Sequence, residues 1–576
     1  MDRQKIEDIY ELSPAQQGMF FQSMLNQSPG MLCEQFLCIL EGVLDVAVLQ
    51  RACAHVISRH PALRTSFHLM ELDKPLQVVH RSIPLPWREL DWRQHSSEAV
   101  TKELEALLKE DREQGFEPRA APLLRFCVIH LSGDRHQFIW SHHHLLMDGW
   151  SLPVVMKEIL VCYESFSRGE RPRLKPSWPY REYIAYLQSR RLEQARPFWQ
   201  AQLRDLHEPT PLGRGPTAAG ADELQELMLK VPSELAARLG ALAREHRVTP
   251  SSLFQAVWAL LLGVHGQRDD VVFGTTVSGR PATPAEAASS VGLFINTLPL
   301  RVVLQPEETL VGFLGRMQAQ RLDLQEYEHT PLVQIQEWSG LPRGKALFDT
   351  LLVFENFPQD ISVAPLRVRE VRVLGGETPY ALTAIVDPEN GYSLRLIHRG
   401  PAIDSALAHE LRDTLLLLLR ALVDTPERPL GELLTALRTA STPASGEPAR
   451  EPSGMTRRQL TEADAPRTPV ERELWSIWCE LLGTREVGIH DDFFRLGGHS
   501  LMATQAISRV RQAFGTDIPL KALFTSGRTI AELAVTLEEH LISKSSEGDL
   551  ASLYAELENL SEDEAERLLR EEENAP

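Results

Sequence analysis

A run rich in proline, serine, threonine and glycine near the end of the chain most limits how this sequence can fold. It reads TASTPASGEPAREPSGMTRR over residues 439–458, and this composition is typical of a linker. Before it, apolar strand patterns alternate with amphipathic helix patterns, and after it come a short helical pattern and an acidic end. We therefore expect at least two separately packed parts, joined by a linker at residues 431–465.

The part before the linker is too long for one hydrophobic core, because single cores rarely grow beyond about 250–300 residues. A strand pattern followed by a helix pattern occurs twice: CEQFLCILEG precedes DVAVLQRACAHVISRH, and LQELMLKVP precedes SELAARLGALAREH. Ser233 is the expected N-cap of the last helix. The repetition predicts two similar α/β lobes, at residues 1–175 and 176–430.

Composition argues against several classes of partner and location. The 576 residues carry a net charge of −19, and phosphate binding needs a basic face, so we expect no nucleic-acid partner. No apolar run is long enough to span a membrane, and the start, MDRQKIEDIY, lacks the apolar region of a signal peptide. The six cysteines are scattered and form no Cys-x-x-Cys pair, as expected for reduced thiols. The sequence predicts a cytoplasmic protein without a membrane partner.

Three consecutive histidines mark the first candidate site. The runs PLLRFCVIH and RHQFIWSHHH flank a Ser-Gly-Asp turn and predict a β-hairpin whose second strand ends in the histidines. Alternate strand residues face the same way, so His142 and His144 should share one face. Asp148 and Gly149 then form a turn into the helix SLPVVMKEILVCYESF, which Ser151 is expected to cap.

The residues alone leave three interpretations of this segment open. The histidines can be core or surface residues without chemistry. His142 and His144 can bind zinc from one strand face, but zinc needs a third and usually a fourth ligand, and no other ligand cluster stands out. One imidazole can act as a general acid or base near neutral pH, with Asp148 fixing the turn by pairing with a basic residue elsewhere. We expect no metal.

The stretch HHLLMDG at His143–Gly149 resembles the His-His-x-x-x-Asp-Gly motif of nonribosomal peptide synthetase condensation domains. Other stretches resemble the remaining motifs of that family, in the family's order: LSPAQQGMFF from Leu12, RHPALRTSF from Arg59, YREYIAYL from Tyr180, FGTTVSGRP ending at Pro281, VGLFINTLPLR from Val291, YEHTPL from Tyr327 and LFDTLLVFEN from Leu347. The resemblance covers nearly all of residues 1–430. It implies a two-lobed fold similar to chloramphenicol acetyltransferase.

The resemblance also implies roles for the residues of the motif. His144, its second histidine, is the catalytic one, which positions or deprotonates an attacking amine or steadies the tetrahedral intermediate. His143 and Asp148 are structural. In the family the aspartate pairs with an arginine, and Arg280 is the candidate here.

Two further positions belong to the implied site. Gly149 lies near the reacting centre and allows close backbone approach, and Asn296 is a candidate for the wall of the site. For Arg280 and Asn296 the alternative to a role in the site is a structural role in packing or in a turn. The implied reaction is acyl transfer that forms an amide bond. An alcohol acceptor that gives an ester, or a recruitment platform without catalysis, are the rival functions.

A second candidate site lies in DDFFRLGGHSLMATQAISRVRQAFG. It lacks the Gly-x-Ser-x-Gly pattern of a hydrolase nucleophile, because residue 502 is Met. An amphipathic helix is predicted over residues 501–514, with Ser500 at its start. Ser500 can be an ordinary N-cap, or it can carry a phosphodiester, which a helix N-terminus favours. Gly497 and Gly498 leave room for a modifying enzyme.

This region resembles a peptidyl carrier domain, a small all-α bundle of four helices, and we assign it to residues 466–543. The four-helix pattern is expected in TPVERELWSIWCELLG, in the segment after Ser500, in a short turn at PLKALFTS and in TIAELAVTLEEHLI. The resemblance implies that Ser500 carries a covalent 4′-phosphopantetheine arm whose thiol holds an acyl group.

The resemblance implies several protein partners. They are an upstream carrier that brings the donor, a phosphopantetheinyl transferase, and an adenylation enzyme that acts in trans or belongs to a missing part of the chain. The acidic tail at residues 544–576 is either a solvated end or a docking segment for a downstream synthetase subunit.

Overall fold

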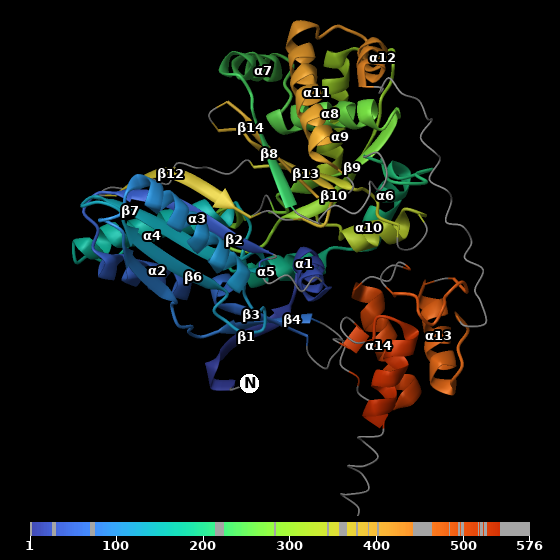
Figure 1. Ribbon diagram of the computed structural model, residues 1–576, viewed down its shortest axis with the longest axis horizontal. Helices are drawn as coiled ribbons and strands as arrows, with labels where there is room; N and C mark the ends of the chain where they lie inside the picture. The colour runs from blue at the N-terminus through green and yellow to red at the C-terminus, as the bar shows by residue number, and fades with distance from the viewer. Residues whose placement is uncertain are drawn as a thin grey trace, which may run out of the picture. The chain divides into compact units, whose positions relative to one another are not determined.

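The fold comes from a computed structural model of the 576-residue chain (Figure 1). The chain divides into two compact units, one spanning residues 1–70 and 75–454 and one that takes in residues 455–576. The structure describes residues 3–25, 30, 32–69, 75–212, 224–281, 284–341, 345–355, 366–375, 378–389, 391–399, 403–441, 464–482, 484–493, 496, 500–515, 518, 522–523 and 527–541.

The N-terminal lobe of the first unit is built on two sheets. The larger has the strand order β12-β2-β7-β6-β5, and the smaller has the order β1-β4-β3. The strands are β1 (Ile6–Glu11), β2 (Cys33–Glu41), β3 (Thr65–Leu69), β4 (Pro75–His80), β5 (Trp87–Asp91), β6 (Leu124–His130), β7 (Arg135–His143) and β12 (Arg367–Leu374). The predicted hairpin is confirmed, since β6 and β7 pair antiparallel.

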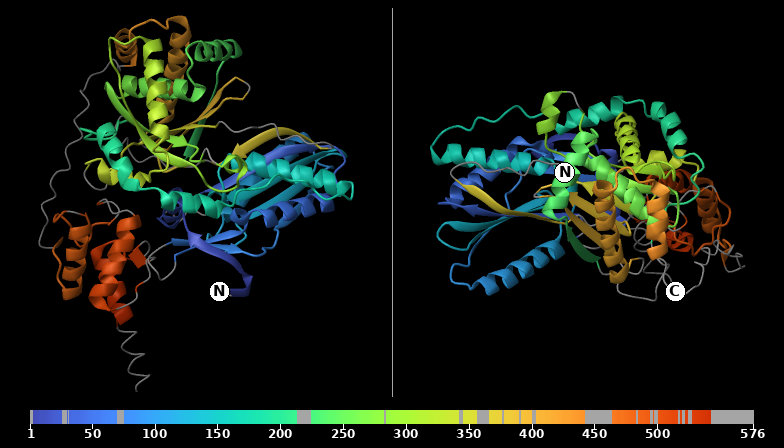
Figure 2. Two further views of the ribbon diagram at one scale, coloured as in Figure 1. Left: turned by 180° about the vertical axis from the view of Figure 1, so that it is seen from behind. Right: turned by 90° about the horizontal axis from the view of Figure 1, so that it is seen from above.

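Helices cover both faces of the larger sheet. The helices are α1 (Pro14–Leu25), α2 (Val46–Arg59), α3 (Ser97–Gln114) and α4 (Ser151–Ser167), and the short 3-10 turns are η1 (Arg3–Lys5), η2 (Pro61–Arg64) and η3 (His144–Leu146). Phe36 and Trp140 point to the core shared with α2 and α4, whereas Leu37 and Ile139 point to a core shared with α3. The strands therefore bury apolar residues on both faces. Figure 2 shows α3 and α4 on opposite sides of these strands.

The C-terminal lobe holds one sheet with the strand order β10-β9-β11-β13-β14-β8. Its strands are β8 (Leu224–Lys230), β9 (Asp270–Val277), β10 (Asn296–Val303), β11 (Thr350–Phe354), β13 (Leu382–Asp387) and β14 (Ser393–Arg399). Its helices are α5 (Tyr180–Ser189), α6 (Arg196–Gln202), α7 (Ser233–Glu245), α8 (Pro250–His265), α9 (Leu310–Gln325), α10 (Leu332–Trp338), α11 (Ser405–Asp424) and α12 (Leu430–Ser441), with 3-10 turns η4 (Leu192–Ala195) and η5 (Ala285–Ser289).

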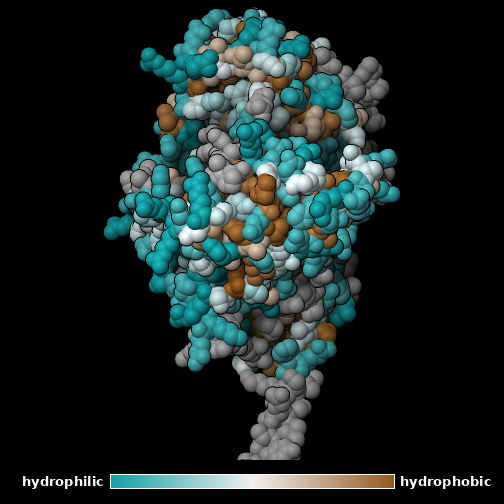
Figure 3. Space-filling view, turned by 90° about the vertical axis from the view of Figure 1, so that its left-hand side faces the viewer, coloured by the Kyte–Doolittle hydropathy of each residue, from teal (hydrophilic) through white to brown (hydrophobic). Residues whose placement is uncertain are grey.

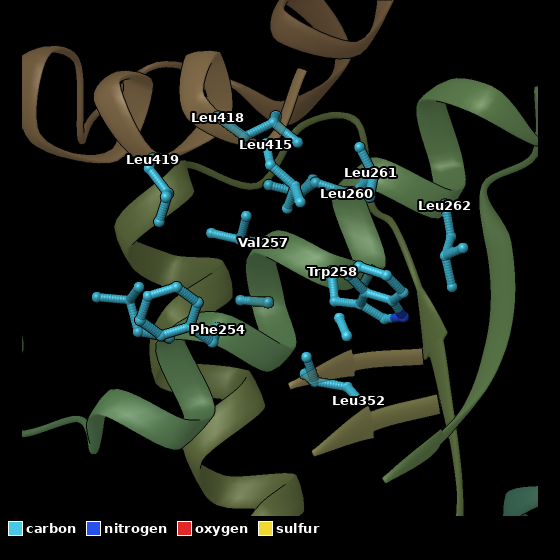
Figure 4. Close-up of a cluster of buried hydrophobic side chains, with 14 of the residues drawn as sticks. Phe254, Val257, Trp258, Leu260, Leu261, Leu262, Leu352, Leu415, Leu418 and Leu419 are labelled. Carbon is cyan, nitrogen blue, oxygen red and sulfur yellow. The ribbon is translucent and has the colours of Figure 1, made fainter. Parts of the chain in front are cut away.

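Helix α8 forms the centre of this lobe because it is apolar on every side. All its residues from Ser252 to Val264 are buried. Figure 4 shows Phe254, Val257 and Trp258 of this helix beside leucines of α11 and Leu352 of β11. The face of the molecule in Figure 3 is mostly hydrophilic, and its apolar side chains gather near the middle.

One strand joins the two halves of the sequence. β12 comes from the segment assigned to the C-terminal lobe, yet it pairs antiparallel with β2 at the edge of the N-terminal sheet. The predicted boundary between residues 175 and 176 therefore leaves β12 on the C-terminal side, although this strand belongs to the sheet of the N-terminal lobe.

Three local expectations were wrong. Ser233 is not an N-cap, since α7 begins at that residue and Pro232 occupies the cap. Ser151 likewise is the first residue of α4, and its backbone N–H donates to the Asp148 carboxylate. The linker starts later than residue 431, because α12 runs to Ser441 with Leu433 and Leu434 buried. Apolar spacing at Leu430, 433, 434 and 437 is the signal that predicts this helix.

The second unit is helical, as expected. Its helices include α13 (Pro469–Leu482) and α14 (Ser500–Phe514), and residues 530–541 and 522–523 are helical too. Leu474 and Trp478 of α13 are fully buried with Val510 of α14, so these helices share a core. Gly497 and Gly498, where room for a modifying enzyme was expected, lie outside the described residues. The tail at 544–576 also lies outside them.

No helix among the described residues is by itself long and apolar enough to cross a membrane; α7 and α8 meet the criterion only as a pair, bent by 109°.

Candidate active site and carrier serine

The strand that carries the histidines ends before the last of them. Strand alternation would place His142 and His144 on one face only if the strand included both residues. β7 ends at His143, and His144 is the first residue of the 3-10 turn η3. The ring of His142 packs on Trp140 with 5.2 Å between ring centroids, as expected for alternate strand residues. His144 has left the strand, so the prediction that it shares the face of His142 does not apply.

Backbone contacts hold His144 at the start of this turn. Its N–H donates to the carbonyl of Leu32 at 2.8 Å, and Leu32 has a φ of 61°. A positive φ is unfavourable for a branched residue such as leucine, and it persists only where the surroundings enforce it. The chain thus accepts local strain beside the candidate catalytic residue.

The side chain of His144 has a defined hydrogen-bonding pattern. Nδ1 lies 3.1 Å from the carbonyl oxygen of Met147. A carbonyl oxygen only accepts hydrogen bonds, so Nδ1 carries the proton in the neutral ring, and Nε2 keeps a free lone pair. The partly buried ring can therefore accept a proton at Nε2.

The side chains of His143 and His142 are buried. Nδ1 of His143 accepts the backbone N–H of Leu145 at 3.1 Å and so caps η3. Burial, followed by the nearby His144, lowers the pKa of His143 to about 3. Burial, followed by His144 and His143, lowers the pKa of His142 to about 3. The described residues contain no group of three or more His, Cys, Asp or Glu side chains that could hold a metal ion.

Asp148 and Arg280 form a buried ion pair between the lobes. Arg280 Nη2 lies 2.8 Å from Asp148 Oδ1, and the two side chains are 6% and 0% exposed. Three further groups donate to the same carboxylate: the N–H and the hydroxyl of Ser151 at 2.9 and 2.8 Å, and the N–H of Phe294 at 3.0 Å. The expected pairing of Asp148 with Arg280 is thus present, and a buried carboxylate with four donors is well compensated.

The guanidinium of Arg280 also binds the loop before β10. It donates to the carbonyls of Ala287 and Ser290 at 3.2 and 2.9 Å, and it lies 4.0 Å above the centroid of the Phe294 ring. All these contacts come from the C-terminal lobe. Arg280 therefore ties the histidine turn of one lobe to a loop of the other.

Gly149 and Asn296 differ in what surrounds them. Gly149 is exposed in the turn between η3 and α4. Asn296 donates from Nδ2 to the carbonyls of Glu328 and Thr330 at 2.9 and 2.7 Å, while its Oδ1 accepts the N–H of Thr297. These contacts favour the packing alternative for Asn296 over a place in the site wall.

Two tyrosines that were not singled out as site residues hold the same loop. Tyr180 donates to the carbonyl of Leu293 at 2.5 Å, and Tyr183 donates to the carbonyl of Phe294 at 3.1 Å. Tyr180 also covers Gly292, where any added Cβ would lie 2.1 Å from the ring. Both tyrosines belong to the motif YREYIAYL, so their one-turn spacing was a signal available in the sequence.

Ser500 lies where the sequence predicts it, at the first residue of α14. The buried residues of this helix are Met502, Ala503, Ala506, Ile507 and Val510. The first backbone N–H groups of a helix have no acceptor within it, so this position suits a phosphodiester on the serine. The backbone of this unit therefore fits a phosphate-linked group at Ser500.

Comparison with known proteins gives a family match for each part of the chain. Residues 6–441 match the family described as Condensation domain, and residues 472–537 match the family described as Phosphopantetheine attachment site. The first match includes the histidine segment and Arg280, and the second includes Ser500.

Similar curated proteins are components of peptide synthetases. A linear gramicidin synthase protein of Brevibacillus parabrevis is 38% identical over 447 residues, 75% of this chain and 9% of that protein. A mycosubtilin synthase protein of Bacillus subtilis is 30% identical over 544 residues, 90% of this chain and 21% of that protein. The chain therefore spans only a small part of each of these relatives.

Solved structures support the fold. The first condensation domain of the calcium-dependent antibiotic synthetase superposes with a TM-score of 0.64 at 19% identity, covering 74% of this chain and 98% of that one. A four-domain nonribosomal peptide synthetase gives a TM-score of 0.64 at 17% identity, covering 83% of this chain and 36% of that one. The expected two-lobed fold, similar to chloramphenicol acetyltransferase and followed by a helical domain, is confirmed.

Proposed function

Because this chain belongs to the condensation domain family and carries a phosphopantetheine attachment domain, we propose that it forms amide bonds in nonribosomal peptide synthesis. The donor is an acyl or peptidyl thioester on the carrier of an upstream protein. The acceptor is an amine held by the arm on Ser500. The chain is then an acyltransferase that uses already activated substrates.

The hydrogen bond between His144 Nδ1 and the Met147 carbonyl is the observation that carries this proposal. It directs the free lone pair of the imidazole to Nε2. As the amine nitrogen bonds to the thioester carbon, Nε2 accepts the proton that the nitrogen loses. The carbon–sulfur bond breaks, and the proton passes to the departing thiolate, so the imidazole returns to its neutral form.

The other residues of the motif position this imidazole. His143 fixes the turn through Leu145, and the Asp148–Arg280 pair fixes the segment that follows it. Gly149 is proposed to leave space beside the reacting atoms. Asn296 is retained as a supporting residue that orders the loop of Glu328 and Thr330.

Ser500 is the proposed attachment residue of 4′-phosphopantetheine. When bound, this group supplies a flexible arm whose thiol holds the acceptor as a thioester. The positive end of the α14 dipole, at Ser500, would favour the negative charge of the phosphate. Tethering both reactants makes the encounter effectively intramolecular, which favours reaction strongly.

The proposed partners follow from this chemistry. A phosphopantetheinyl transferase must modify Ser500, and an adenylation enzyme must supply the activated acceptor. We assign the acidic segment at 544–576 to docking of a downstream synthetase protein, supported by its leucines among acidic residues. The cytoplasm is the proposed location, supported by the six free cysteine thiols.

Intact-protein mass spectrometry tests the proposal. The chain is treated with a phosphopantetheinyl transferase, loaded with an aminoacyl group and mixed with a loaded donor carrier. We expect the mass of the arm at Ser500, followed by the mass of the transferred donor.

His144→Ala should slow this transfer by about 10²–10⁴-fold, the contribution of a general base. His95→Ala, a change at a partly exposed histidine outside the motif, is the matched control. Transfer that is unchanged in His144→Ala would instead favour a recruitment platform. A hydroxyacyl acceptor distinguishes the ester-forming alternative in the same assay.

A further inference from the structure

The turn that carries His144 is too short to pair all of its backbone N–H and C=O groups with one another. η3 is a single 3-10 turn of three residues, so most of its N–H and C=O groups need partners from outside. Two side chains supply them at Leu145. His143 Nδ1 accepts the N–H of Leu145, and Gln16 Nε2 donates to its carbonyl at 3.1 Å. The residue next to His144 is therefore held from both sides.

The side chain of Gln16 is itself fixed by the start of α1. Gln16 Oε1 accepts the N–H of Ser13 at 3.0 Å, and the hydroxyl of Ser13 accepts the N–H of Gln16 at 3.2 Å. This reciprocal pattern is a capping box, formed by the Ser-x-x-Gln of the motif LSPAQQGMFF. It directs Oε1 to Ser13 and leaves Nε2 for Leu145.

A second buried amide completes the arrangement. Gln77 Nε2 donates to Gln16 Oε1 at 3.0 Å and to the carbonyl of Glu11 at 2.9 Å. Gln16 and Gln77 are each 1% exposed. A fully satisfied buried network of this kind rigidifies its surroundings. Gln77 contacts Gln16 but, among its hydrogen bonds, none reaches the carbonyl of Leu145.

We infer that Gln16 is a positioning residue for the reaction proposed above: it holds the turn that aims the imidazole of His144 at the attacking amine. This inference rests on the proposed function. Gln16 acts through the carbonyl of Leu145 and touches no reacting atom. Displacing a base by about 1 Å costs roughly a hundredfold in rate. A protein that lacks this contact should therefore transfer the acyl group slowly even when it is saturated with donor carrier.

The matched pair Gln16→Met and Gln77→Met tests this role. Each variant keeps the side-chain volume and breaks the amide pair, but only Gln16→Met removes the donor to Leu145, together with the acceptor for the Ser13 N–H. Single-turnover transfer is measured over a range of donor-carrier concentrations on the full chain with the arm loaded. We expect the rate at saturating donor to fall about tenfold to a hundredfold in Gln16→Met relative to Gln77→Met. The donor concentration at half-maximal rate should change little.

Equal rates in the two variants would overturn the inference, because the shared loss of packing would then explain the effect. If Gln16→Met gives no cooperative unfolding transition, Gln16→Glu replaces it. At pH 8 its ionised carboxylate keeps the acceptor for the Ser13 N–H but cannot donate to Leu145, so its rate at saturating donor should again fall below that of Gln77→Met. A rate equal to that of Gln77→Met contradicts the role. A parent chain without any transfer would refute the proposed function itself.

Discussion

At the scale of single residues, His142 illustrates how burial couples a side chain to pH. It lies beside the candidate catalytic residue, packs on Trp140 and is 3% exposed, and its Nδ1 atom has no hydrogen-bond partner. Burial lowers its pKa from 6.5 to about 3, so the folded chain keeps it neutral. The unfolded chain binds a proton there below about pH 6.5.

This difference predicts a pH-dependent stability. Between pH 6.5 and 3 the unfolded state holds more protons at this site than the folded state does. The contribution of neutral His142 to the free energy of unfolding is therefore complete above pH 6.5 and is lost as the pH falls towards 3. His142→Phe should reduce the slope of unfolding free energy against pH by about 1.4 kcal/mol per unit between roughly pH 5.5 and 4. Urea unfolding across that range measures it, with the parent chain as the reference. Parallel curves for the two chains would contradict the assignment.

The residues of the candidate site were predictable where a motif names them and less so elsewhere. His144, Asp148 and Ser500 lie in short motifs with specific spacing, so their places at a turn and at a helix start could be expected. Tyr180 and Tyr183 act on main-chain carbonyls more than a hundred residues away, at Leu293 and Phe294. Such contacts depend on how the lobes pack, which local patterns do not encode.

At the scale of elements, the end of α7 shows a favourable turn made with an unfavourable residue. The N–H of Val248 donates to the carbonyl of Ala243, and the N–H of Arg247 donates to that of Arg244. This is a Schellman motif, in which the residue after the cap is usually glycine. Here that residue is Arg247, with a φ of 54°.

Arg247→Gly should therefore stabilise the first unit by about 0.5–1 kcal/mol, because glycine adopts this conformation without strain. The gain is smaller than the relieved strain, since glycine also makes the unfolded chain more flexible. Chemical denaturation provides the measurement. Arg244→Gly, one turn earlier inside α7, is the control and should cost about 1 kcal/mol. A loss of stability in Arg247→Gly would show that its side chain matters more than its backbone.

The same scale explains which elements could be predicted. The hairpin of β6 and β7 and the helices α2, α7 and α14 follow from periodicity. The cap of α7 was misplaced by one residue because serine and proline both favour helix starts. Helix α12 was missed because its leucines adjoin a run of linker residues.

At the scale of the whole molecule, the two lobes of the first unit depend on each other. β12 reaches across to complete the N-terminal sheet, and Arg280 reaches across to neutralise Asp148. The pairing of β12 with β2 joins residues more than three hundred positions apart, so no local pattern predicts it.

Asp148→Asn should destabilise the first unit by about 3–5 kcal/mol, because it leaves the buried charge of Arg280 without its counter-ion. Glu208→Gln is the control. It removes a partner from the exposed pair of Arg268 and Glu208 and should cost less than about 1 kcal/mol. Urea midpoints for the two variants measure the difference. Equal, small losses would mean that Arg280 is adequately solvated by the carbonyls around it.

The position of this ion pair has a consequence for motion. Points close to an axis of rotation travel less than points far from it. Asp148 follows His144 by four residues and fastens one lobe to the other, so any opening of the lobes about that fastening would swing their outer ends widely. The imidazole proposed as the base would stay nearly still, so the proposed reactants would enter and leave without its realignment at each turnover.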